Sequence, residues 1–99
     1  MSGISKLDHR LNIKKLDSQT INIKVSNNEM LMSIVGQFNQ NLKELEKLTN
    51  TIIFFRGNSI TCKGKKDNLE KFSEAIKFLV NKYLLTNYIE KEDILLSVN

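Results

Sequence analysis

The stretch SIVGQFNQNLKELEKL, residues 33–48, decides the fold that this sequence predicts. An apolar helical segment ends at Gly36, and Asn39 can open a second helix from Asn41 to Leu48. A glycine loop therefore joins two helices, with Lys43 in the first turn of the second helix. Such a loop is either the turn of a simple helical hairpin or a cradle for phosphate groups, and both interpretations are open at this point.

The segments that flank the two helices have the pattern of β-strands. TINIKV, residues 20–25, alternates apolar and polar side chains, as a half-buried strand does. TIIFFRGNSITCKG predicts two further strands, over 51–56 and 59–63, joined by a tight turn at Gly57 and Asn58. The residues around the loop therefore predict strand, helix, helix, strand, strand.

A long amphipathic helix completes the pattern. KDNLEKFSEAIKFLVNKYLL, residues 66–85, has apolar residues at steps of three and four. The order β-α-α-β-β-α predicts an α+β domain with a three-stranded antiparallel sheet and with helices packed on one face of it. We expect this domain at 19–86, between an irregular N-terminal arm, 1–18, and an acidic C-terminal extension, 87–99.

The composition limits the classes of protein to consider. A chain of 99 residues suffices for one domain, and its single cysteine excludes an intramolecular disulfide. No apolar run has the length of a signal-peptide core or of a membrane span, so we expect a cytoplasmic protein without a membrane partner. The net charge of +4 favours a polyanionic partner, although a lysine-rich surface is often only solvated.

The sequence contains none of the common catalytic or metal-binding motifs considered next. The sequence has no P-loop, no HExxH, no GxSxG and no EF-hand loop. Its one histidine, His9, lies in the predicted arm, where a solvated side chain is the simplest expectation. Cys62 has an inward strand position and no basic partner, which favours packing over reactivity. We therefore expect no catalytic residue, no metal and no cofactor.

The loop resembles that of a type I KH domain, in which a Gly-x-x-Gly loop joins two helices. The matching residues are Ile34, Val35, Gly36, Asn41, Leu42, Lys43 and Glu46. Asn39 stands where that family has its second glycine, and asparagine tolerates left-handed dihedrals better than most residues. The resemblance implies a KH-like fold and a partner that is RNA or single-stranded nucleic acid.

A closer resemblance is to the N-terminal KH-like domain of PhoH-like proteins, bacterial P-loop ATPases linked to phosphate starvation and RNA metabolism. NLKELEK, RGNSITCKG and the long helix follow one another as they do in that domain, and the resemblance covers about residues 20–98. IEKEDILLSV, residues 89–98, resembles the segment that leads out toward the ATPase. No ATP site carries over, because no residues here correspond to it.

From the loop we expect a nucleic-acid-binding site. Gly36 permits close approach of the backbone, N–H groups at the start of the second helix attract anions, and Lys43 adds charge. Phe38 can stack on a base. The predicted site consists of Gly36, Gln37, Phe38, Asn39, Asn41 and Lys43. The alternative is that Gly36 only ends a helix and Phe38 packs inward, which would leave a protein-interaction or regulatory domain, or a fragment of an ATPase that is inactive alone.

The face of the sheet opposite the helices has two apolar residues, Ile52 and Phe54, among polar ones. We expect them to form a docking surface for an ATPase domain or a second copy of the chain, with Arg56 at its rim. The rival expectation is that the N-terminal arm folds back over them. The residues that would then cover this face are Leu7, Leu11 or Ile13.

Overall fold

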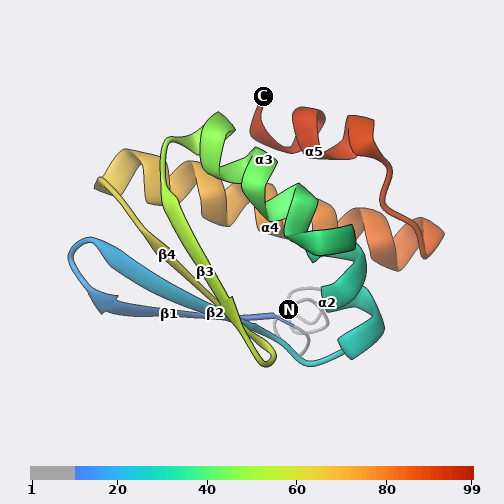
Figure 1. The fold of residues 1–99 in the computed structure, drawn as a ribbon, viewed down its shortest axis with the longest axis horizontal. Coiled ribbons are helices and arrows are strands. Elements are labelled where there is room, and N and C mark those ends of the chain that lie inside the picture. The colour runs from blue at the N-terminus through green and yellow to red at the C-terminus, as the bar shows by residue number, and fades with distance from the viewer. Residues whose placement is uncertain (1–10) are drawn as a thin grey trace, which may run out of the picture.

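The computed structural model describes residues 11–99 (Figure 1). The expectations for Leu7 and His9 lie outside this range. In chain order the elements are β1 (Leu11–Asp17), β2 (Thr20–Val25), α2 (Asn28–Val35), the 3-10 turn η1 (Gln37–Asn39), α3 (Gln40–Thr49), β3 (Ile52–Arg56), β4 (Ser59–Lys63), α4 (Lys66–Thr86) and α5 (Lys91–Val98). The chain is therefore a compact α+β domain, as its periodicity predicts.

The sheet has four antiparallel strands in the order β1-β2-β4-β3, so the prediction of three strands is wrong. The additional strand, β1, comes from the segment expected to be an irregular arm. It pairs with β2 through a short turn in which the carboxylate of Asp17 accepts a hydrogen bond from the Gln19 N–H at 2.8 Å. The sequence pattern of β1 is weak, because Leu11 and Ile13 are its only residues that pack into the core and two lysines follow them.

The helices α2, α3 and α4 pack on one face of the sheet, as predicted (Figure 1). Alternate residues of the central strands point into the core, where they meet the apolar stripes of α2, α3 and α4. The largest fully buried side chains are Phe72, Ile23, Met30, Leu31, Ile34, Leu45, Ile60, Ile76, Leu79 and Ile94. Among residues 11–99, no helix is both long enough and apolar enough to cross a membrane.

The C-terminal extension folds as part of the same domain. Asn87 ends α4 in a left-handed conformation, and α5 then packs against α3 and α4 with Ile94 buried. Glu90 and Asp93 form a capping box, and Lys82 Nζ donates to both carboxylate oxygens of Asp93 at 2.8 and 2.9 Å. Both β1 and α5, which lie outside the predicted 19–86, contribute residues to the same core.

Candidate functional site

Gly36 and Asn41 form the base of the predicted binding loop. Gly36 has φ 82° and ψ 166°, and its N–H donates to the Met32 carbonyl at 2.9 Å. A Cβ added at Gly36 would lie 2.7 Å from the Asn41 side chain. Asn41 in turn donates through Nδ2 to the Ser33 carbonyl at 3.3 Å. Both residues therefore join α2 to α3, and Asn41, which was predicted to bind a ligand, has its amide engaged within the protein.

The tip of the loop is η1, and it presents Phe38 to solvent. Phe38 has φ 55° and ψ 33°, and Asn39 has φ 60° and ψ 24°, so two successive residues are left-handed. Asparagine adopts this conformation readily, whereas a bulky aromatic residue rarely does. The Phe38 side chain is 87% exposed. The alternative in which it packs inward is therefore wrong, and a strained backbone holds an aromatic ring in water.

The backbone N–H groups of the loop are only partly available to an anion. The N–H of Asn39 donates to the Gly36 carbonyl at 3.1 Å, and that of Gln40 donates to the Gln37 carbonyl. The N–H groups of Gln37 and Phe38 have no acceptor among residues 11–99, and no side chain caps the start of α3. Lys43 is exposed in the first turn of that helix. Of the residues predicted to bind phosphate, Gln37, Phe38 and Lys43 are therefore the ones whose polar groups remain free of contacts within residues 11–99.

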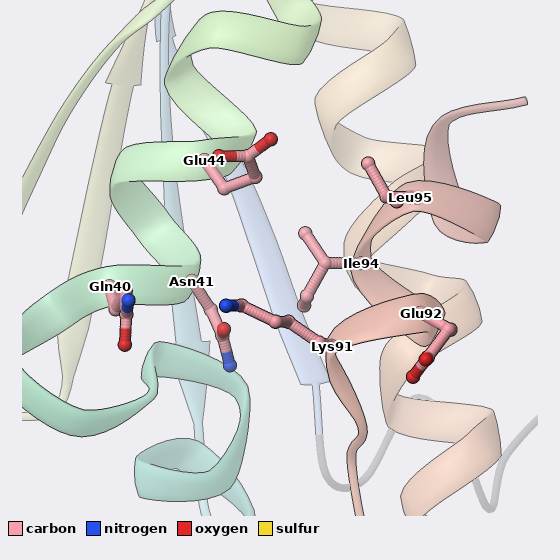
Figure 2. A pocket seen from close by; sticks show the side chains of 7 residues that line it. All are labelled: Gln40, Asn41, Glu44, Lys91, Glu92, Ile94 and Leu95. Carbon is pink, nitrogen blue, oxygen red and sulfur yellow. The ribbon is translucent and has the colours of Figure 1, made fainter.

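A groove of about 400 Å³ lies beside the loop, between the first turns of α3 and α5. Its lining residues are Gln40, Asn41, Glu44, Lys91, Glu92, Ile94 and Leu95. Figure 2 shows Lys91 extending from α5 toward α3 across this groove. Because two carboxylates stand against one ammonium group, the groove does not favour phosphate. Sequence reasoning missed it because it exists only when α5 docks, and the spacing of Glu90 and Asp93 was the one local sign of that helix.

The outer face of the sheet, opposite the helices, presents the three residues predicted to form an interface. Ile52 is 58% exposed and Phe54 is 54% exposed, and Arg56 is exposed beside them. Leu11 pairs with Val25 and Ile13 pairs with Ile23, so both lie on the helix-covered face. The rival expectation, in which Leu11 or Ile13 covers Ile52 and Phe54 on the outer face, is therefore wrong.

The one cysteine of the chain, Cys62, lies in the core and not in a reactive site. Cys62 is fully buried, and this burial raises the pKa of its thiol to about 11, so the thiol is protonated at neutral pH. Within residues 11–99 no three potential metal-ligating side chains gather at one point.

No protein-family model matches this chain, and no curated protein matches it. The exposed Phe38 of the loop and the exposed Ile52 and Phe54 of the outer sheet face are the features of the described chain that suit a binding partner.

Proposed function

We propose that this chain is a KH-like module that binds RNA or another single-stranded nucleic acid. The exposed ring of Phe38, presented on left-handed backbone at the tip of η1, is the observation that carries the proposal. A base can stack on that ring, a contact that is worth about 1–3 kcal/mol in other single-strand-binding proteins. The order β2-α2-α3-β3-β4-α4, with β1 before it and α5 after it, supports the proposal, because a KH domain of type I has the order β-α-α-β-β-α.

The backbone beside Phe38 suits the phosphate that accompanies a stacked base. The N–H groups of Gln37 and Phe38 have no internal acceptor in the described chain, and Lys43 adds a positive charge in the first turn of α3. A phosphate placed there exchanges water for charge-assisted hydrogen bonds. Gly36 and Asn41 support the loop from within, and Asn39 completes its left-handed turn.

The test is fluorescence anisotropy with a short labelled RNA, measured at two salt concentrations. The variant Gln37→Asp/Phe38→Asp removes the ring and adds two negative charges at exposed positions, so it should abolish binding without unfolding the domain. The matched control is Asn81→Asp/Leu85→Asp on α4, which also replaces one exposed amide and one exposed apolar side chain. We expect the control to bind nearly as the wild type does. Equal affinity of both double variants would remove the loop from the site, and no binding by the wild type would refute the proposed function.

A second candidate is a protein-interaction or regulatory domain, and exposed apolar side chains favour it. Leu85 and Tyr88 stand out from the end of α4, and Leu95 and Leu96 are exposed on α5. In a PhoH-like protein such surfaces would face the ATPase domain or another subunit. Sedimentation of the wild-type chain tests this candidate. A stable oligomer that disperses in a Leu85→Ser/Leu96→Ser variant would support it, and a monomer at high concentration would leave self-association without support.

A further inference from the structure

Positive charge is concentrated on the sheet of this protein. The strands carry five cations, Lys14, Lys15, Lys24, Arg56 and Lys63, and a single acidic residue, Asp17. The remainder of residues 11–99 has eight cations and nine acidic residues, so it is nearly neutral. The net charge of +4 is therefore not spread evenly over the surface but belongs mainly to one layer of the fold.

The strand register places four of the five cations on the outer face. One row across the sheet consists of Lys14, Asn22, Thr61 and Phe54, and the next row consists of Asn12, Lys24, Ser59 and Arg56. A third row holds Asp17, Thr20, Lys63 and Ile52. Strands lie about 4.8 Å apart, so each row spans roughly 15 Å. The cations thus surround a polar centre, while Lys15 pairs with Ile21 on the other face.

The centre of this face combines hydrogen-bonded polar side chains with an exposed aromatic ring. Asn22 Nδ2 donates to Ser59 Oγ at 2.5 Å and to Thr61 Oγ1 at 3.0 Å, which ties the Asn22 amide on β2 to two side chains of β4. Lys63 Nζ lies 6.0 Å from the centre of the Phe54 ring. Phe54, Phe55, Arg56, Ser59, Thr61 and Lys63 line a hollow of about 540 Å³ at this edge of the sheet.

We propose that the outer sheet face is a second binding surface for single-stranded nucleic acid, separate from the loop at Phe38. A base stacks on Phe54, Arg56 and Lys63 contact the adjacent phosphates, and Lys24 and Lys14 continue the path across β2 and β1. This inference rests on the proposed function and adds the surface along which the strand runs. Asp17 lies at the end of β1, where its carboxylate is engaged by the Gln19 N–H.

Charge distinguishes a nucleic acid from a protein as the occupant of this face. The cores of protein–protein interfaces are depleted in charged residues, and lysine is depleted across such interfaces. Here Ile52 and Phe54 on β3 are large and apolar, and four cations and one carboxylate, Asp17, share the three rows with them. Burying these cations against a protein would require four matching carboxylates, whereas a phosphate backbone supplies the negative charge along its whole length.

The experiment is an anisotropy titration of a labelled RNA of about a dozen nucleotides over a range of salt concentrations. Arg56→Gln/Lys63→Gln should weaken binding about tenfold or more and make the logarithmic salt slope less steep by roughly 1.4, since each phosphate contact contributes about 0.7. Phe54→Ser should weaken binding about tenfold without changing that slope, and Phe54→Tyr should restore affinity. The control Lys47→Gln/Lys71→Gln removes the same charge from exposed helix positions and should change affinity little.

The outcomes separate this inference from the proposed function. If the wild type binds RNA but the sheet variants bind as tightly as the control, the inference is wrong and the loop proposal stands. Equal losses in the sheet variant and the control would indicate attraction by net charge alone, which also overturns it. If the wild type self-associates and Phe54→Ser disperses it, the face is a protein interface instead. Absence of binding by the wild type refutes both proposals.

Discussion

At the scale of single residues, Gly36 is the position where the backbone permits only one amino acid. Its φ of 82° with ψ of 166° belongs to a region that is almost restricted to glycine, and an added Cβ would collide with Asn41. Gly36→Ala should therefore lower the free energy of unfolding by about 2–3 kcal/mol, combining backbone strain with a steric clash. Urea denaturation followed by circular dichroism measures this loss.

The matched control is Gly57→Ala in the turn between β3 and β4. Gly57 also has a positive φ, of 61°, but an added Cβ would meet nothing within 4 Å. We expect this substitution to cost only about 1 kcal/mol, which is the penalty for left-handed backbone without a clash. If the two variants lost the same free energy of unfolding, the Asn41 side chain would not obstruct a Cβ at position 36.

Cys62 provides a second prediction at this scale. Because the thiol is buried and its pKa is raised to about 11, a thiol reagent at pH 8 should not modify the native protein. Modification should be complete after unfolding in guanidinium chloride. A Cys62→Ala/Lys63→Cys variant, with its thiol one residue further along β4 on the outer face, should react at once in the native state. Rapid labelling of native wild-type Cys62 would contradict the packing role.

At the scale of elements, α5 depends on Asp93. This buried carboxylate accepts hydrogen bonds from Lys82 Nζ and from the Glu90 N–H, and these interactions lower its pKa. Asp93→Asn should lower the free energy of unfolding at neutral pH by about 1–3 kcal/mol, since it removes a charge-assisted contact between α4 and α5. The control is Glu92→Gln, the same chemical change at an exposed position of the same helix.

The pH dependence of this contact has a definite sign. A carboxyl group whose pKa is lower in the folded state stabilises the fold above its unfolded pKa, which is about 3.9 for aspartate. That contribution is lost as the pH falls through the folded pKa. The difference in unfolding free energy between wild type and Asp93→Asn should thus be constant near pH 7 and shrink below about pH 4. A difference that does not change with pH would mean that packing, not ionisation, is responsible.

At the scale of the whole molecule, the same substitutions on the two faces of β3 should lower the melting temperature by very different amounts. Ile52 and Phe54 are more than half exposed, so Ile52→Ser/Phe54→Ser should leave the melting temperature within a few degrees of the wild type. Ile53 and Phe55 pack against the core from the same strand. Ile53→Ser/Phe55→Ser should lower the melting temperature far more, by an amount that corresponds to several kcal/mol. A comparable loss in both variants would place β3 between two packed layers.

Local periodicity determined most of the elements of this protein. The alternation in TINIKV and on both sides of Gly57 and Asn58 located β2, β3 and β4 to within a residue, and the helical stripes located α2, α3 and α4. Gly36 marked the end of α2 because only glycine suits its backbone there. These features follow from residues near one another in the chain, so the sequence specifies them before any tertiary contact forms.

Only the tertiary structure decided which of these residues face a ligand. β1 and α5 have weak patterns of their own and become ordered elements because β2 and the helices α3 and α4 complete their hydrogen bonds and burial. Asn41 and Phe38 look equally suitable in the sequence, yet the Asn41 amide donates to the Ser33 carbonyl while Phe38 remains in water. The basic outer face needs the register of four strands, since it joins Lys14, Lys24, Arg56 and Lys63 from distant parts of the chain. Such juxtapositions depend on contacts between segments far apart in sequence, which no local pattern records.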